Sequence, residues 1–184
     1  MNRLFIAISP PDDLRRDIAE LARTVPGGRP VPMEQLHLTL KFLGDVEGGR
    51  QLDIEEALGL VSRPPFALSL CGVGVFPPRG MPRVVWAGID PVEELTALRR
   101  NIEKVLMDVG IPREKQKFAP HLTLARLNAP SLGRLQSFLA GNSLLRSPSF
   151  AVDEFTLYAS RLTPRGAIHS EVAVYPLAGT LSER

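Results

Sequence analysis

Apolar residues recur at the spacing of an amphipathic helix in four parts of the chain. The clearest pattern covers residues 91–109, where Leu95, Leu98 and Ile102 begin a stripe that continues to Gly110. Glycine and proline end such patterns because both disfavour the helical backbone. The predicted helices are residues 12–24, 50–61, 91–109 and 130–140.

Short apolar runs between turn-forming residues predict strands in most of the remaining chain. The runs at 66–76 and 83–89 flank a proline-rich turn and therefore predict a hairpin. Because strands and helices are mixed and hairpins are present, the pattern excludes a doubly wound parallel sheet and favours the α+β class. The predicted strands are residues 4–9, 36–43, 66–76, 83–89, 121–127, 150–160 and 168–175.

Two of these strands contain the same tetrapeptide, His-Leu-Thr-Leu, which begins at His37 and again at His121. The chain has only three histidines, so most of them head this repeat. Successive side chains of a strand point to opposite faces. His37 therefore shares a face with Thr39, and His121 with Thr123, while the leucines point the other way. Packing alone gives no reason to repeat both polar residue types on one face, so the repeat indicates two halves of one site.

The order of the predicted elements also repeats, since the second half of the chain matches the first apart from the opening strand. We expect one domain over residues 1–184, made of two interleaved lobes whose approximate halves are residues 1–90 and 91–184. The lobes should face each other across a central cleft. Each motif strand should turn its His/Thr face toward that cleft.

The composition is ordinary for a globular protein, with 44% hydrophobic and 23% charged residues. A formal net charge of +2 is too weak to establish a nucleic-acid partner, but it is compatible with an anionic substrate. The single cysteine excludes an internal disulfide and a zinc site built on paired thiolates. The first apolar run is too short for a signal peptide or a membrane span, so we expect a cytoplasmic protein without a membrane partner.

Two facing histidines can divide acid–base catalysis, because an imidazole can hold or lack its proton near neutral pH. In-line displacement at phosphorus suits this division, since the attacking and leaving oxygens lie on opposite sides of the phosphorus. The hydroxyl groups of Thr39 and Thr123 are candidates to hold the non-bridging oxygens. Arg126 and Lys41 are candidate cations for the charge that develops there.

Other uses of these residues have less support. Neither motif has a second His, Cys or carboxylate at metal-ligand spacing, so we expect no metal and no cofactor. The chain lacks a G-x-S-x-G nucleophile elbow, and Cys71 lies in an apolar run, which disfavours a Ser or Cys nucleophile. It also lacks the G-x-x-x-x-G-K-[ST] phosphate loop, so nothing in the sequence indicates use of ATP.

The chain resembles the RNA 2′,3′-cyclic phosphodiesterase family, also called the 2′-5′ RNA ligase family, of the 2H phosphoesterase superfamily. That superfamily is named for two His-x-Thr/Ser-x motifs, which the two tetrapeptides match. The resemblance extends over nearly the whole chain. Its segments are Arg3–Ala7, His37–Gly44, Phe76–Pro77, Trp86–Gly88, Phe118–Arg126 and the closing Ser160–Gly166, which includes Arg165.

The resemblance implies a bilobal fold of two pseudo-symmetric lobes with largely antiparallel sheets around a central cleft. It also implies metal-independent opening of an RNA-terminal 2′,3′-cyclic phosphate to a 2′-phosphomonoester, with 2′-5′ joining of RNA in the reverse sense. Carried over by position, His37 and His121 are the catalytic pair. Our hypothesis is that His37 is the proton donor and His121 the proton acceptor, although the symmetric motifs fit the reversed roles as well. Thr39, Thr123 and Arg126 are the expected phosphate-binding residues. The expected partners are RNA ends or nucleotides that carry a 2′,3′-cyclic phosphate, bound by a monomer.

Two positions depart from the family pattern. His169 stands where the family usually has a tyrosine, and residues 29–31 lack a tryptophan that is often found before the first motif. Both departures leave the phosphate chemistry intact and bear on contacts to the base or ribose. We expect a structural or cleft-rim role for His169. For Phe42 and Phe118 we expect core packing rather than stacking on a base.

Basic residues near the second motif and around the proline-rich loop are candidates to hold an RNA backbone, although a solvated surface explains them equally well. They are Arg113, Lys115, Lys117, Arg79 and Arg83. Two alternative functions stay open from the sequence. One is a phosphodiesterase that acts on small cyclic nucleotides, and the other is a non-catalytic module that binds RNA ends.

Overall fold

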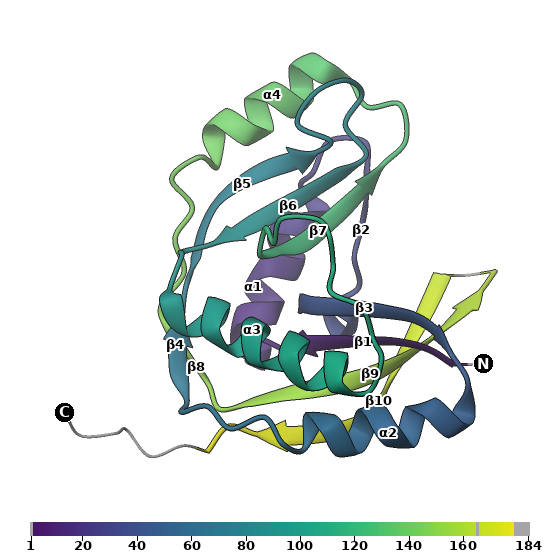
Figure 1. The fold of residues 1–184 in the computed structure, drawn as a ribbon. Coiled ribbons are helices and arrows are strands. Elements are labelled where there is room, and N and C mark those ends of the chain that lie inside the picture. Colours follow the sequence, from purple (N-terminus) through teal and green to yellow (C-terminus); the bar gives the residue numbers. More distant parts are fainter. Residues whose placement is uncertain (1, 165, 179–184) are drawn as a thin grey trace.

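The computed structural model describes residues 2–164 and 166–178 of the chain (Figure 1). Within these residues, eight of ten strands form one antiparallel sheet in the order β10-β9-β1-β3-β7-β6-β5, with β2 beside β7. Strands β4 and β8 pair separately. The strands are β1 (Asn2–Ile8), β2 (Gly28–Pro30), β3 (Leu38–Val46), β4 (Phe66–Leu68), β5 (Leu70–Phe76), β6 (Val84–Ile89), β7 (His121–Leu127), β8 (Phe150–Val152), β9 (Glu154–Thr163) and β10 (Gly166–Pro176).

The large sheet is almost divided where the two motif strands meet. Strands β3 and β7 pair through a single residue couple, Leu38 with Leu122, whereas the other neighbouring strands share longer ladders. One half of the sheet contains β1, β3, β9 and β10, and the other contains β2, β5, β6 and β7. We propose that these halves are the two expected lobes, each of which combines strands from the first and the second half of the chain.

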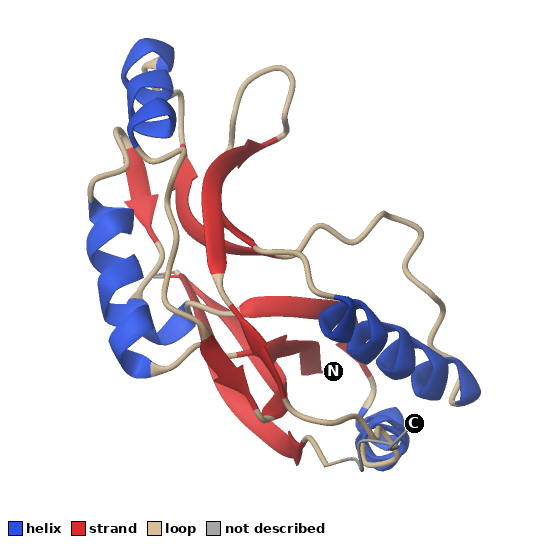
Figure 2. Cartoon of the chain, turned by 90° about the vertical axis from the view of Figure 1, so that its left-hand side faces the viewer, coloured by secondary structure: helices blue, strands red, loops and turns tan. Residues whose placement is uncertain are grey.

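Helices flank the strands on both sides (Figure 2). Helix α1 (Asp12–Arg23) packs against β2 and β7, while α2 (Gly48–Leu58) and α3 (Glu93–Asp108) pack against each other. A short 3-10 turn, η1 (Met33–Gln35), precedes β3, and α4 (Leu132–Gly141) follows β7. The motif leucines form the centre of the core, with at most 1% of each exposed: Leu38, Leu40, Leu122 and Leu124.

The predicted α+β class and antiparallel sheet are confirmed, as is the hairpin of β5 and β6. The predicted strand 150–160 is two strands, because the chain leaves the ladder at Asp153. Strand β2 escaped prediction because a glycine and a proline in three residues signal a turn, yet it pairs with β7. No helix in the described part of the chain is long and apolar enough to cross a membrane. Arg165, part of the closing family segment, lies outside the described residues.

Candidate active site

The polar faces of both motifs line one cleft. Its volume is about 420 Å³, and its walls include His37, Thr39, His121, Thr123 and Arg126. All five predicted site residues are therefore brought together, although they come from segments far apart in the sequence. The alternation of each motif explains the arrangement, because the leucines are buried in the core and leave the histidine and threonine on the cleft face.

A β-bulge at the fourth residue of the first motif changes which side chains face the cleft. Thr39 and Lys41 pair with neighbouring residues of β1, so Leu40 is the extra residue on β3. Because Thr39 and Lys41 oppose adjacent positions, they point to opposite faces, and the next residue, Phe42, returns to the face of Thr39. A regular strand would have placed Phe42 in the core and Lys41 in the cleft.

The second motif has its bulge at the equivalent leucine. Thr123 and Ala125 pair with neighbouring residues of β6, which makes Leu124 the extra residue on β7. Ala125 is consequently buried, with no exposed surface. The following residue, Arg126, points to the cleft face beside Thr123, where it lines the cleft. The bulge is thus what brings the expected phosphate-binding arginine to the site.

Because of the bulge at Leu40, the expectations from the sequence for Lys41 and Phe42 are wrong. Lys41, considered as a cation for the phosphate, is only 3% exposed and donates from Nζ to Glu103 Oε2 at 2.8 Å, so it is committed to a buried ion pair. Phe42, expected in the core, is 64% exposed and lines the cleft. Phe118 is partly buried, as expected, and packs against the core.

Each of the two motif histidine rings is held by a hydrogen bond to the backbone two residues earlier. His121 Nδ1 lies 2.7 Å from the carbonyl oxygen of Ala119, two residues earlier. A carbonyl oxygen only accepts, so Nδ1 carries the hydrogen and Nε2 of the neutral ring is the free acceptor. The backbone of Gln35, again two residues earlier, hydrogen-bonds to the ring of His37. Both rings are thereby oriented by the chain that leads into their strand.

His37 is held in the neutral form when the cleft is empty. Burial, the charge of His169 and the charge of His121 lower its pKa to about 4, against the hydrogen bond that the ring donates to the Gln35 backbone, which raises it. The His169 ring lies edge-on to that of His37, with centroids 5.4 Å apart. Burial also lowers the pKa of His169, whose Nδ1 is buried without a hydrogen-bond partner among the described residues.

An aromatic wall supports the first histidine, and sequence reasoning did not single it out. The ring of Phe5 stacks on that of Tyr158 at 5.2 Å and lies 4.9 Å from the rings of both His37 and His169. His169 thus lies on the cleft wall, in agreement with the expected structural or cleft-rim role. The signal for Phe5 was its place in the Arg3–Ala7 segment of the family pattern.

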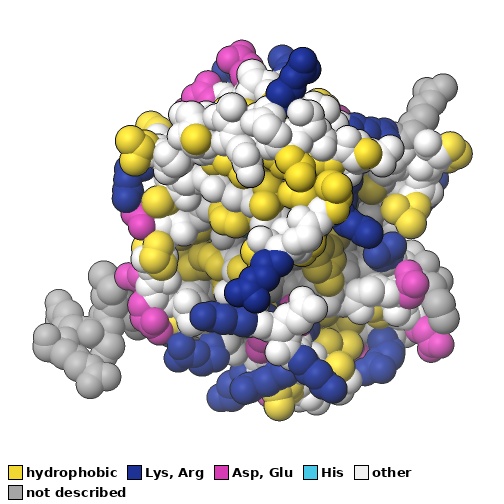
Figure 3. Space-filling view, turned by 90° about the horizontal axis from the view of Figure 1, so that it is seen from above, with side chains coloured by type: hydrophobic (Ala, Val, Ile, Leu, Met, Phe, Trp, Pro, Cys, Tyr) yellow, Lys and Arg dark blue, Asp and Glu magenta, His cyan; other side chains and the backbone are white. Residues whose placement is uncertain are grey.

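Positive charge surrounds the cleft. Arg3 and Arg29 line it together with Arg126, and Arg29 and Arg126 are cross-strand neighbours on β2 and β7. On the face seen from above, where no histidine is visible, Lys and Arg side chains lie across and below an apolar area (Figure 3). Among the basic residues considered for RNA, Lys117 lines a second cavity of about 360 Å³, which adjoins the cleft at His121. Arg113, Lys115, Arg79 and Arg83 line neither cavity.

The described residues contain no cluster of three or more His, Cys, Asp or Glu side chains placed to hold a metal ion. Among the described residues, the cleft offers three imidazoles, three hydroxyls and three guanidinium groups. This set can move protons and bind an anion.

The chain is similar in sequence to known proteins along most of its length. A sequence profile of the 2′-5′ RNA ligase superfamily matches residues 10–163. A protein of Archaeoglobus fulgidus named RNA 2′,3′-cyclic phosphodiesterase is 35% identical, over 94% of this chain and 99% of its own length. A Thermus thermophilus protein of the same name is 35% identical, over 96% of this chain and 91% of its own.

The fold comparison gives the same result. The crystal structure of E. coli LigT complexed with 3′-AMP superposes with a TM-score of 0.78 and 28% identity, and the match covers 97% of this chain and 99% of LigT. The likeness therefore spans sequence and fold from end to end. On this basis the chain belongs to the 2′-5′ RNA ligase superfamily.

Proposed function

We propose that this protein is an enzyme that hydrolyses an RNA-terminal 2′,3′-cyclic phosphate to a 2′-phosphomonoester, and that it can join RNA through a 2′-5′ bond when an RNA 5′-hydroxyl takes the place of the water. The observation that carries the proposal is the convergence of two identical His/Thr faces on one cleft. The relatives named RNA 2′,3′-cyclic phosphodiesterase support the reaction, and the LigT structures with 3′-AMP and with phosphate support a nucleotide and phosphate ligand.

In the proposed mechanism, a water oxygen attacks the phosphorus while Nε2 of His121 removes its proton. The bond between phosphorus and the ribose 3′-oxygen breaks on the opposite side, and His37 gives its proton to that oxygen. One P–O bond forms, one breaks, and the product keeps the phosphate on the 2′-oxygen. Thr39, Thr123 and Arg126 donate hydrogen bonds to the non-bridging oxygens as negative charge grows on them.

The orientation of His121 supports its role as the base. Its Nδ1–H donates to the Ala119 carbonyl oxygen at 2.7 Å, which leaves Nε2 as the acceptor on the cleft side. The backbone bond also keeps the ring from rotating and stabilises the imidazolium that forms after proton transfer.

The low pKa of His37 fits a general acid whose ring becomes protonated when the anionic substrate binds. In the empty cleft the ring is neutral, because burial and like charges oppose protonation. A cyclic phosphate brings one negative charge between the histidines, which favours the imidazolium form and raises its pKa. His37 then holds its proton when substrate is present, and transfers it readily once charge develops on the leaving oxygen.

The test is incubation with 2′,3′-cyclic AMP followed by product analysis. We expect 2′-AMP, full activity in a chelator, and loss of most activity in His37→Ala and in His121→Ala with the fold retained. Arg134→Ala, at an exposed position on α4, is the control that should keep full activity. Formation of 3′-AMP, restoration by a divalent metal after chelation, or an active His121→Ala protein would each contradict the mechanism.

The proposal also covers the size of the substrate, the oligomeric state of the enzyme and its location in the cell. Comparing rates on RNA ends and on small cyclic nucleotides separates the RNA enzyme from the small-molecule alternative, and a protein that binds both without turnover is the binding module. We propose that the enzyme acts as a monomer, because one chain supplies the whole cleft, and that it works in the cytoplasm. Sedimentation of the purified protein and fractionation of cells test these two points.

A further inference from the structure

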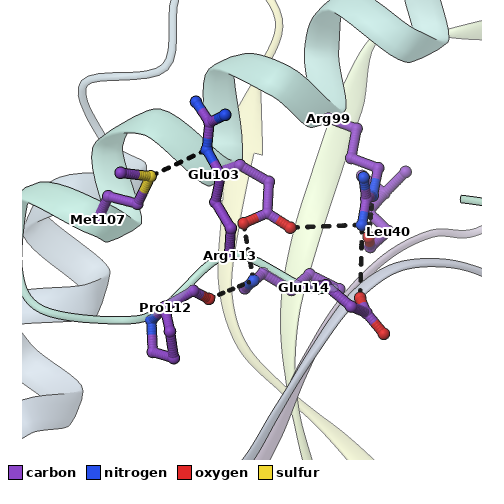
Figure 4. A network of polar contacts seen from close by, with 8 residues as sticks. Leu40, Arg99, Glu103, Met107, Pro112, Arg113 and Glu114 are labelled. Atoms are coloured by element: carbon purple, nitrogen blue, oxygen red, sulfur yellow. Dashed lines mark hydrogen bonds and ion pairs between the residues drawn. The ribbon is translucent and has the colours of Figure 1, made fainter. Parts of the chain in front are cut away.

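A charged network lies beside the active-site cleft, between α3 and the strand of the first motif (Figure 4), and several of its residues, Arg99 among them, line the second cavity. Its centre is Arg99 on α3, whose side chain is 16% exposed. Arg99 Nε donates to the carbonyl oxygen of Leu40 at 3.2 Å. Leu40 is the bulged residue of the first motif, which a bulge leaves outside the sheet ladder. The guanidinium group of Arg99 thus donates a hydrogen bond to a backbone carbonyl oxygen that the bulge left unpaired in the ladder.

The same guanidinium group holds the segment that leads into the second motif. An Arg99 terminal nitrogen lies 3.4 Å from Glu114 Oε2, and its guanidinium carbon lies 4.6 Å from the centre of the Phe118 ring. Both partners belong to the connector of residues 109–120, which joins α3 to β7 without a helix or strand. Ala119, immediately after Phe118, supplies the carbonyl oxygen that orients His121.

A buried ion pair fixes this arrangement from the strand side. Lys41, next to the bulge, donates to Glu103 Oε2 at 2.8 Å and to the carbonyl oxygen of Pro112, at the start of the connector, at 3.0 Å. The other oxygen of Glu103 lies 3.3 Å from Arg99. Lys41 and Glu103 are each less than 5% exposed, so these contacts are shielded from water.

We propose that Arg99 is a positioning residue, which ties the bulge of the first motif to the connector of the second and so sets the placement of His121 opposite His37. The inference rests on the proposed function and deepens it. An arginine suits the task because one planar guanidinium group can meet a carbonyl, two carboxylates and an aromatic face at fixed angles, whereas lysine is a point charge on a flexible stem. Small displacements of a catalytic group cost rate steeply, since the reacting atoms must lie within a narrow range of distances.

The experiment compares Arg99→Met and Arg99→Lys with the wild-type chain on 2′,3′-cyclic AMP. We expect kcat to fall by about tenfold to a hundredfold in Arg99→Met with little change in KM, because binding groups stay and the base is misplaced. Arg99→Lys should recover only part of the loss. In both variants, the ¹⁵N resonances of His121 should show a weakened Nδ1 hydrogen bond.

Two variants of the same helix serve as controls. Arg100→Met removes the neighbouring guanidinium, which pairs with Glu93 at the surface where both side chains are at least 65% exposed. Ile102→Val trims a fully buried side chain and lowers thermal stability without touching the network. Both should keep the wild-type kcat when assayed below their unfolding temperatures.

Several outcomes would overturn the proposal. These are an Arg99→Met enzyme with wild-type kcat, a loss that Ile102→Val reproduces, or unchanged His121 resonances in the Arg99 variants. If Arg99→Met fails to fold, Glu114→Gln tests the same link from the partly exposed connector side, and there too a wild-type kcat would refute it. The resonances of His121 are measured without turnover, so inactivity of the wild-type protein on both cyclic AMP and RNA ends would refute the proposed function and leave this test standing.

Discussion

Replacing His169 with phenylalanine should raise the pKa of His37. The two imidazole rings lie edge-on with centroids 5.4 Å apart, and both line the cleft. Phenylalanine keeps an aromatic ring against Phe5, whose centroid is 4.9 Å from that of His169, but it cannot carry a charge. The substitution therefore removes one of the charges that oppose protonation of His37 and leaves the packing nearly unchanged.

The separation of the rings sets the magnitude. Two unit charges 5.4 Å apart repel by about 0.8 kcal/mol in bulk water and by about 3 kcal/mol at an effective dielectric constant of about 20. At about 1.4 kcal/mol per pKa unit, these limits correspond to about 0.6 and about 2 units. We expect a rise of about one unit from the present value of about 4, because the surroundings of the two half-buried rings lie between these two limits. Burial, the largest cause of the low pKa, remains in the variant, as do His121 and the cleft arginines.

An NMR titration of the His37 ring protons in wild type and His169→Phe measures this change. The control is Tyr158→Phe, which alters a ring 6.4 Å from that of His37 and removes its hydroxyl without changing any charge near His37 at acidic pH. The control should leave the His37 pKa where it is. An unchanged pKa in His169→Phe would refute the coupling of charges, and an equal rise in Tyr158→Phe would assign the effect to packing instead.

Three further predictions concern the same cleft. The pKa of His37 is 6.5 in the unfolded chain and about 4 in the folded one, so the unfolded state binds the proton more tightly. The free energy of unfolding should therefore fall by about 3 kcal/mol as the pH drops from about 6.5 through about 4. Urea denaturation should show this slope in wild type, and a His37→Gln variant should lack that part of it. Inorganic phosphate should raise the His37 pKa, since an anion beside the ring favours the imidazolium; an NMR titration in which phosphate leaves the pKa unchanged would place the anion elsewhere. Thr123→Val should lower kcat by about tenfold to a hundredfold by removing a donor to the developing charge, and Thr123→Ser should restore most of it.

The sequence was sufficient for the faces of the motif strands as far as their fourth residue. Alternation placed the histidines and threonines on one face and the leucines on the other, and the structure agrees. Beyond that point the bulges at Leu40 and Leu124 reverse the alternation. No residue type in the two motifs predicts these bulges, because they arise from the way β3 and β7 pair with other strands. That is why Lys41 and Phe42 lie on the faces opposite to those expected.

Contacts between distant segments were also beyond sequence reasoning. Arg99 and Leu40 are 59 residues apart, and nothing in either segment shows that one donates to the other. The apolar stripe of α3 predicted a helix with a buried face, but the same face also buries Glu103. Its partner Lys41 comes from β3, and only the packed structure brings the two together.

The single pairing of Leu38 with Leu122 has a consequence for the reaction itself. Each of these leucines is the second residue of its motif, so the motif meets its own copy at the same position. In a homodimer such an isologous contact lies on the dyad, where residue i of one subunit meets residue i of the other. The chain therefore carries an approximate internal dyad between its motif strands, and His37 and His121, each one residue before these leucines, lie on opposite sides of it. In the proposed mechanism, a phosphorus near this axis meets the same kind of proton-transfer group on both of its in-line sides, so hydrolysis and its reversal, closure of the cyclic phosphate, differ only in which imidazole gives the proton and which receives it.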